Sequence, residues 1–185
     1  MKATVISMQP SWSDYTIKEM EVEFYSEEYQ SNEPVRVYAK FYKDGKIQRF
    51  PSLACVSNDP YYYIAGGKIM EKIIEFQGEK AKNLFEKASS VDKQYDDQIE
   101  AIYNSEEFKK AHDRNRELDR EINELYNKSK RARREDKKEE YDALRYKLEE
   151  ERKEIQESII EPFEDKQRKL RAQSKKALRE IVIEL

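Results

Sequence analysis

The feature that most constrains the fold is a series of apolar and small residues between positions 108 and 132, spaced alternately three and four apart. Its members are Phe108, Ala111, Asn115, Leu118, Ile122, Leu125, Ser129 and Ala132. This heptad spacing places them on one seam of an α-helix, which packs against a second helix. A helix over residues 106–134 would extend roughly 43 Å. That is longer than a core built from the first 90 residues, so we expect an arm.

A second helix is expected to return along the first. Asp136 and Glu139 fall on the next seam positions and interrupt the pattern. A new seam then begins, formed by Tyr141, Leu144, Leu148 and Ile155. The sequence therefore predicts an antiparallel helical hairpin, a coiled-coil arm, with its turn at residues 133–138. It leaves open whether the seam closes within one chain or between two, so we expect a monomer or a homodimer formed through the arm.

Proline and a further apolar pattern define the C-terminal segment. Pro162 is expected to end or kink the returning helix, because proline lacks a backbone N–H. One face of a last helix then carries Phe163, Leu170, Ser174, Ala177, Leu178 and Ile181. Residues 181–185 alternatively form a closing strand.

The N-terminal segment has the period-two pattern of an antiparallel sheet. Met20, Val22 and Phe24 alternate with acidic residues, which is typical of a strand with one buried face. We expect strands near 3–8, 17–25, 35–43 and 46–50, with Asp44-Gly45 in a hairpin turn. A helical stripe should cover the sheet, and it comprises Ile69, Ile73, Phe76, Ala81, Leu84, Phe85 and Ala88. Gly66-Gly67 is expected to act as a hinge before this helix, and Ser89-Ser90 to end it.

These patterns together predict an α+β fold. A small N-terminal antiparallel β-meander packed on a helix occupies residues 1–90, the helical hairpin residues 91–162, and a basic amphipathic helix with a possible closing strand residues 163–185. Charged residues make up 41% of the chain and hydrophobic residues 37%, which indicates much exposed helix and a thin core.

Composition also bears on where the protein acts. No apolar stretch approaches the roughly 18 residues of a membrane span, and the N-terminus lacks the apolar core of a signal peptide. The single cysteine, Cys55, has no second cysteine for an internal disulfide and suits a reducing compartment. We expect a cytoplasmic protein without membrane contact, in the host cytoplasm if the chain is virus-encoded.

The residues offer little for catalysis. His112 is the only histidine, so neither a Ser-His or Cys-His pair nor a zinc site is supported, and no cofactor is expected. An acidic strip of Glu19, Glu21 and Glu23 can serve a Mg²⁺-dependent nuclease or recognise a partner. We favour a solvent-exposed sheet face in which Arg36 and Lys40 pair with these acids across strands.

Two short motifs have similar alternatives. Gly66-Gly67-Lys68 at a helix start would offer N–H groups to a phosphate, although a hinge is favoured. Tyr61-Tyr62-Tyr63 can stack bases, but aromatic packing between sheet and helix is the preferred interpretation.

Two clusters of basic residues are candidate binding sites. At the expected arm tip these are Lys130, Arg131, Arg133 and Arg134. Residues 166–179 contain seven basic residues and no acid, and Arg168, Arg171, Lys175 and Arg179 share one narrow face of the last helix. The acids of the N-terminal segment can neutralise this stripe internally, or an external anionic partner can.

These observations favour a non-enzymatic protein-interaction module that regulates or inhibits a partner protein, and a nucleoprotein complex is one such partner. A phage-encoded inhibitor of a host nucleic-acid-binding defence machine, like the anti-CRISPR proteins, is one such role and rests on composition. Direct nucleic-acid binding through the two basic clusters is the alternative, and a carboxylate and Mg²⁺-dependent nuclease is the third.

Overall fold

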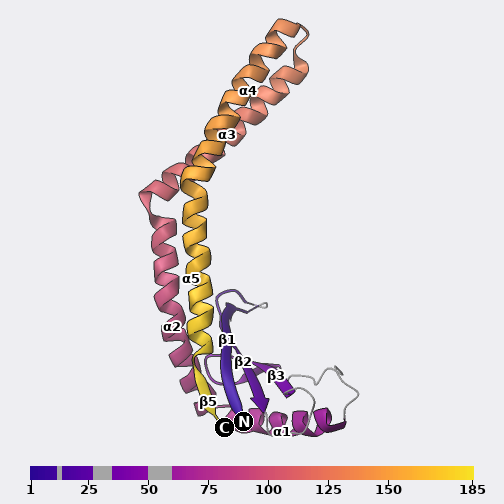
Figure 1. Ribbon diagram of the computed structural model, residues 1–185, viewed down its shortest axis with the longest axis vertical. Coiled ribbons are helices and arrows are strands. Elements are labelled where there is room, and N and C mark those ends of the chain that lie inside the picture. Colours follow the sequence, from indigo (N-terminus) through magenta and orange to yellow (C-terminus); the bar gives the residue numbers. More distant parts are fainter. Residues whose placement is uncertain (12–13, 27–34, 50–59) are drawn as a thin grey trace. The chain divides into compact units, whose positions relative to one another are not determined.

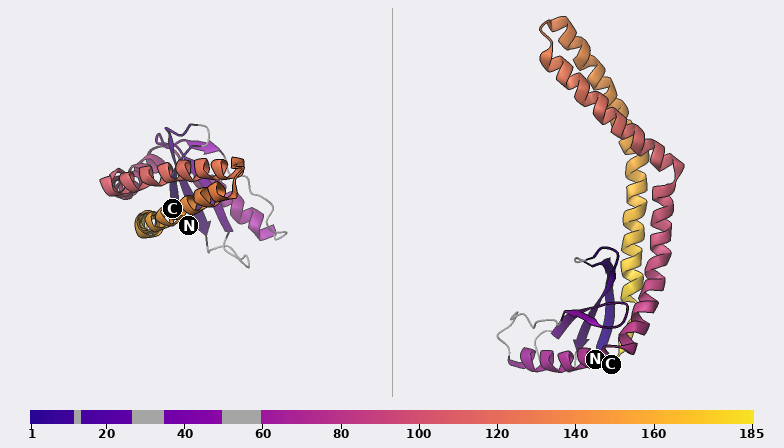
Figure 2. Two further views of the ribbon diagram at one scale, coloured as in Figure 1. Left: turned by 90° about the horizontal axis from the view of Figure 1, so that it is seen from above. Right: turned by 180° about the vertical axis from the view of Figure 1, so that it is seen from behind.

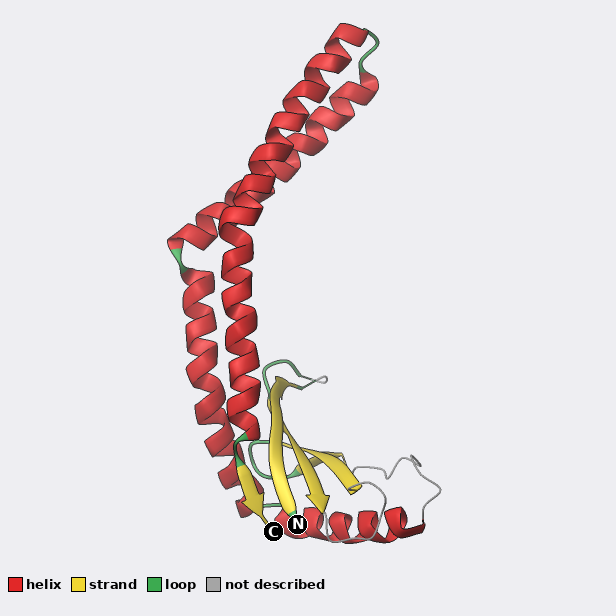
Figure 3. Ribbon diagram, viewed as in Figure 1, coloured by secondary structure: helices red, strands yellow, loops and turns green. Residues whose placement is uncertain are grey.

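The computed structural model describes residues 1–11, 14–26, 35–49 and 60–185 and confirms the α+β class (Figures 1 and 3). Its residues group into two units. The first contains Met1–Asp96 and Arg171–Leu185, and the second contains Asp97–Leu170. The C-terminal segment that the sequence set apart thus contributes its last 15 residues to the sheet unit.

The sheet of the first unit has five antiparallel strands in the order β4-β3-β2-β1-β5. They are β1 (Lys2–Pro10), β2 (Lys18–Ser26), β3 (Val35–Phe41), β4 (Ile47–Arg49) and β5 (Val182–Glu184). The predicted meander is confirmed, and the closing strand pairs with β1 through Ala3 opposite Ile183. The two chain ends accordingly lie side by side (Figure 2).

One face of this sheet forms the main hydrophobic core. Met20, Val22 and Phe24 are fully buried, as their alternation with acids predicts. Helices α1 (Pro60–Phe76) and α2 (Glu79–Asn104) cover this face with the predicted stripe from Ile69 to Ala88, and Leu178 of α5 (Glu161–Arg179) joins the same core. At its centre the rings of Phe24, Phe41 and Phe76 lie with centroids 5.5–6.1 Å apart, in tilted and edge-on contacts that favour aromatic packing.

Two predicted helix breaks are wrong. Helix α1 runs through Gly66-Gly67, so this pair is neither a hinge nor a helix start, and a phosphate site there loses its structural basis. Helix α2 runs through Ser89-Ser90. The actual break lies at Gly78, where φ is +79°, a conformation that glycine adopts without steric penalty.

The second unit is built from a helical hairpin. Helix α3 (Glu106–Arg131) begins at Ser105, whose side chain accepts a hydrogen bond from the Phe108 N–H at 3.3 Å. Helix α4 (Glu135–Ile155) returns beside it after a short turn at residues 132–134, slightly earlier than predicted (Figures 2 and 3).

Pro162 does not end the returning helix, so of the two expected outcomes, an end or a kink, the first is wrong. Between α4 and α5 the chain forms a π-helical turn, η1 (Gln156–Ile160), in which the Glu161 N–H donates to the Gln156 carbonyl. A π-helical turn widens the helix just before the proline. We attribute the uninterrupted helix to this turn, since it relieves the clash that a proline ring makes with the preceding turn.

The predicted seam of the hairpin is only partly right. On α3 every seam residue from Phe108 to Ala132 is buried or half-buried, and Leu118 is fully buried. On α4, however, Leu144 is 45% exposed, whereas the neighbouring Arg145 side chain is only 18% exposed. Of the four predicted seam residues on α4, Tyr141, Leu148 and Ile155 are half-buried and only Leu144 is misplaced, with Arg145 on the half-buried face in its stead. No residue of α4 is fully buried.

No helix within the described residues is long and apolar enough to cross a membrane. Cys55 and the side chains of Tyr61–Tyr63 fall outside what the structure describes.

Candidate interaction surface at the hairpin tip

Two ion pairs join α3 to α4. Arg114 Nε lies 2.9 Å from Glu151 Oε1, and Arg152 Nη1 lies 2.6 Å from Asp119 Oδ1. Because residues 114 and 119 are on either side of the buried Leu118, the two pairs flank the apolar seam. Both pairs are partly exposed and so contribute modestly to holding the helices together, beside the burial of Leu118.

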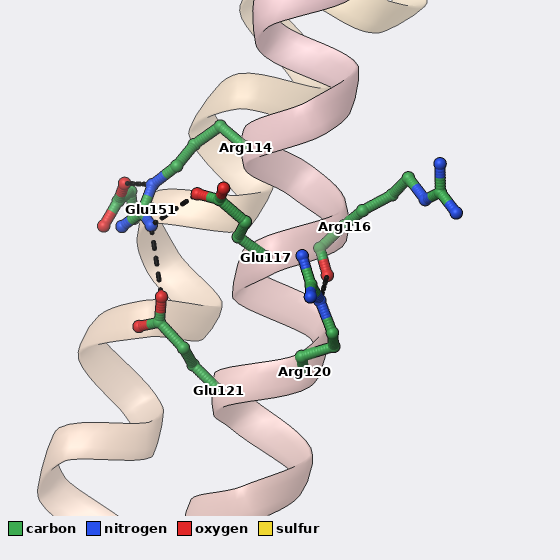
Figure 4. Close-up of polar contacts among 6 residues, drawn as sticks. All are labelled: Arg114, Arg116, Glu117, Arg120, Glu121 and Glu151. Carbon is green, nitrogen blue, oxygen red and sulfur yellow. Dashed lines mark hydrogen bonds and ion pairs between the residues drawn. The ribbon is translucent and has the colours of Figure 1, made fainter.

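Arg114 is the centre of the larger network (Figure 4). Its guanidinium also lies 3.2 Å from Glu121 and 3.5 Å from Glu117. The hydrogen bond to Glu151 raises the pKa of Arg114, with smaller contributions from Glu121. In the same view, Arg120 donates to the backbone carbonyl of Arg116 at 3.4 Å.

The turn between the two helices carries a shallow hollow with a strongly basic lining. Its walls are formed by Lys128, Arg131, Ala132, Arg133, Arg134, Lys137 and Tyr141. Ala132 and Arg134 are in extended conformations, which end α3 and start α4 within three residues. The hollow therefore combines the last turn of one helix with the first two turns of the next.

Three of these cations are held by neighbouring acids. Arg134 makes two hydrogen bonds to Asp136, at 2.6 and 3.1 Å. Lys137 pairs with Glu140 at 2.5 Å, which raises the pKa of this lysine. Lys128 lies 4.0 Å from Glu124, at the limit of an ion pair.

Arg131 and Arg133 are different. Within the residues that the structure describes, neither guanidinium makes an ion pair or a hydrogen bond, and both side chains are exposed. Sequence reasoning had selected both arginines together with Arg134, and all three line the hollow.

Lys130, the fourth predicted tip residue, lies elsewhere. Its ammonium is 4.4 Å from the ring centroid of Tyr126, and Arg145 lies 5.7 Å from the same ring and 5.1 Å from Tyr146. These cation–π contacts form a separate row along the hairpin. Lys128 and Lys137 of the hollow belong to the same basic run around the tip that the sequence indicates, whereas Tyr141 was predicted as a seam residue and not as part of a binding surface.

The predicted basic stripe on α5 is divided between the two units. Arg168 belongs to the second unit, where it pairs with Asp165 at 3.2 Å. In the first unit, Arg171, Lys175 and Arg179 are exposed and pair with no acid among the described residues. The buried Asp92 of α2 accepts a hydrogen bond from Ser174 of α5, but its ion pair is with Lys18, at 2.7 Å.

The acidic strip on β2 is paired across strands, as expected. Arg36 lies 3.1 Å from Glu23, and Lys40 lies 3.7 Å from Glu19. Tyr38 donates a hydrogen bond to Glu23 at 2.8 Å, which raises the pKa of the tyrosine. The predicted solvent exposure of the acidic strip is wrong, because Glu19 is 0% and Glu23 9% exposed.

Metal-ligating side chains are not grouped in the described part of the chain. No three of its His, Cys, Asp and Glu side chains are arranged to hold a metal ion. His112 is exposed on α3 and lies against Phe108, with ring centroids 5.9 Å apart.

Comparison with known proteins found no matching family model, no similar curated protein and no similar solved structure. The geometry at the hairpin tip and on α5 is therefore the basis for any functional argument.

Proposed function

We propose that this protein is a non-enzymatic interaction module that regulates or inhibits a partner protein, which it contacts through the hairpin tip. The observation that carries the proposal is the pair of exposed arginines, Arg131 and Arg133, which lack an acidic partner in the described residues while their neighbours are paired. Arginine and tyrosine are the residues most enriched at the energetic centres of protein interfaces. Both types line the tip hollow.

The charge balance favours an acidic protein surface over a long nucleic acid. Glu124, Asp136 and Glu140 lie beside the cations of the hollow, and the whole chain has a net charge of -3. A polyanion gains affinity by contacting many cations at once, and acids interspersed among them oppose this. A protein partner needs only a few complementary contacts at the tip.

Site-specific photo-crosslinking in cells of the source organism tests this proposal. The crosslinking residue p-benzoylphenylalanine replaces Tyr141 in the hollow or, as the matched control, Tyr103. The control tyrosine is 44% exposed and packs on Phe108 at the other end of α3. We expect a discrete protein adduct from position 141 that position 103 does not give.

Charge reversal completes the test. Arg131→Glu with Arg133→Glu should abolish the adduct, whereas Arg116→Glu, in the middle of the same helix, should leave it unchanged. An adduct that persists in the double variant, or that forms equally from position 103, would contradict contact through the tip.

Direct nucleic-acid binding is a second candidate, supported by the exposed Arg171, Lys175 and Arg179 on α5. Gel shifts with generic DNA and RNA at increasing salt test it, because affinity should fall steeply with ionic strength if these residues contact phosphates. Including Mg²⁺ tests the nuclease hypothesis at the same time. Cleavage that disappears in Glu19→Gln, Glu21→Gln and Glu23→Gln variants would overturn the non-enzymatic proposal.

The remaining parts of the proposal concern context. We propose action in the cytoplasm, as a monomer or as a homodimer through the hairpin, which sedimentation analysis at several concentrations distinguishes. Inhibition of a nucleic-acid-binding defence complex by a phage-encoded protein stays a prediction. It requires that the partner identified at the tip belong to such a complex.

A further inference from the structure

We propose that the hollow at the hairpin tip binds one phosphomonoester group, presented by a phosphorylated side chain of the partner protein. This inference rests on the proposed function, because it specifies the chemistry that the tip recognises. Its basis is the combination of a concave surface, five cationic side chains around it and two guanidinium groups left without an acid.

The first step is the charge of the hollow. Five cations line it, namely Lys128, Arg131, Arg133, Arg134 and Lys137. Three carboxylates, Glu124, Asp136 and Glu140, pair with three of them. Two positive charges remain, both on arginines. A phosphomonoester carries about −1.5 to −2 charges at neutral pH, so one such group balances this excess.

The second step is hydrogen-bonding geometry. A guanidinium offers five N–H donors in a planar fork that matches carboxylate and phosphate oxygens. Arg131 ends α3 and Arg133 lies in the turn, so the two forks reach the hollow from different backbone directions. A phosphomonoester has three terminal oxygens and can accept from both, whereas one carboxylate has two oxygens and a single charge. The second arginine would then stay uncompensated.

The third step excludes a continuous phosphodiester chain. Glu124, Asp136 and Glu140 make ion pairs with cations of the hollow, and Glu135, paired with Lys138, lies next to them in the sequence. Phosphates before and after a bound one would approach these carboxylates and be repelled. An isolated phosphate on a peptide has no such neighbours. Tyr141 and Ala132 add a less polar part to the lining, which suits a side chain that carries its phosphate on a short stem.

Guanidinium NMR of arginine-labelled protein tests the site directly. The probes are a phosphoserine peptide with neutral flanking residues, its unphosphorylated form, its glutamate form and a 5′-phosphorylated single-stranded oligonucleotide. We expect saturable chemical-shift changes of the Arg131 and Arg133 signals with the phosphopeptide, and none with the unphosphorylated or glutamate peptide. The signal of Arg116 should not move, since it lies away from the hollow.

Variants give the magnitude. Charge-assisted hydrogen bonds contribute enough that Arg131→Gln with Arg133→Gln should weaken phosphopeptide binding at least about tenfold. Arg116→Gln should bind as the unaltered protein does. Circular dichroism verifies that each variant keeps its helices, which is expected because all three side chains are exposed.

Three results would overturn the inference. They are the absence of saturable shifts at millimolar phosphopeptide, equal shifts with the glutamate peptide, and tighter binding of the oligonucleotide, which would assign the hollow to nucleic-acid ends. The crosslinking experiment tests the proposed function independently of these binding measurements. A protein adduct at position 141 without phosphopeptide binding keeps the proposed function and rejects this ligand.

Discussion

Glycine-to-alanine substitution at three positions of the first unit tests how the sheet meets its helices. Gly45, in the turn between β3 and β4, has φ of +78° and accepts a hydrogen bond from the Gly78 N–H at 3.1 Å. Gly78 separates α1 from α2 with φ of +79°, and Gly67 lies within α1. The same chemical change should therefore have three different effects.

The magnitudes follow from the local geometry. A Cβ at position 45 would lie 2.1 Å from the Gly78 carbonyl oxygen, so the two segments must separate. Gly45→Ala combines this clash with left-handed strain of roughly 1–2 kcal/mol and the loss of a hydrogen bond worth about 1 kcal/mol, for a total above ~3 kcal/mol. Gly78→Ala meets open space and should cost only the strain. Gly67→Ala should stabilise the protein by ~0.5–1 kcal/mol, since alanine is the better helix former.

Urea unfolding followed by circular dichroism measures these differences as shifts of the midpoint at constant slope. The expected order of stability is Gly67→Ala, the unaltered protein, Gly78→Ala and then Gly45→Ala. If Gly45→Ala is no worse than Gly78→Ala, the close backbone approach is wrong. If Gly67→Ala instead lowers the stability of the protein, position 67 is not part of a continuous helix, and the hinge role of the glycine pair would be supported.

Two further predictions concern the hairpin and the first residue of β2. Leu118→Ala should lower the free energy of unfolding by about 2–4 kcal/mol and raise amide exchange in α3 and α4, because the Leu118 side chain is fully buried. Leu144→Ala should cost under ~1 kcal/mol, because Leu144 is 45% exposed. Equal effects of the two substitutions would show that Leu144 lies in the seam, as the heptad spacing predicts. Lys18 hydrogen-bonds Asp92 at 2.7 Å and Asp96 at 2.6 Å, and these pairs outweigh burial and raise its pKa. The stabilisation that these pairs give is complete below the ordinary lysine pKa and is lost as pH rises through the raised pKa of Lys18. Lys18→Met should therefore remove this loss from the alkaline part of a plot of unfolding free energy against pH. An unchanged plot would show that the pairs contribute nothing to stability.

Most of the first unit could be predicted because burial leaves a periodic signal in the sequence. The alternation around Met20 and the stripe from Ile69 to Ala88 correctly indicated which faces are buried. The helix boundaries carried no such signal. A glycine pair is a local reason for a break, yet α1 continues through it, and the break falls at the single Gly78, whose positive φ favours glycine. The close approach of Gly45 to the Gly78 carbonyl oxygen requires glycine at position 45 instead.

The hairpin shows a related limit of pattern reading. Leu144 fits a heptad seam by spacing and hydrophobicity, but Arg145 occupies the position facing α3. Its guanidinium lies 3.3 Å from Glu149 and over the rings of Tyr126 and Tyr146. A long charged side chain can pack its stem in a seam and keep its charge paired at the edge. Hydrophobicity alone therefore does not predict which of Leu144 and Arg145 faces α3.

The candidate site could be located from its basic run, but selecting the available cations required ion pairing. In helices, residues three or four apart can pair, and this spacing accounts for Lys128 with Glu124 and Lys137 with Glu140. Arg131 has Glu135 four positions later, so the same rule predicts a pair that does not form. The helix ends at Arg131, and the extended turn puts the glutamate in a different helix, where it binds Lys138 instead. The unpaired state of Arg131 is thus a consequence of where α3 ends: only a helix continuing past residue 135 would place Glu135 one turn from Arg131, and the turn interrupts it three residues earlier.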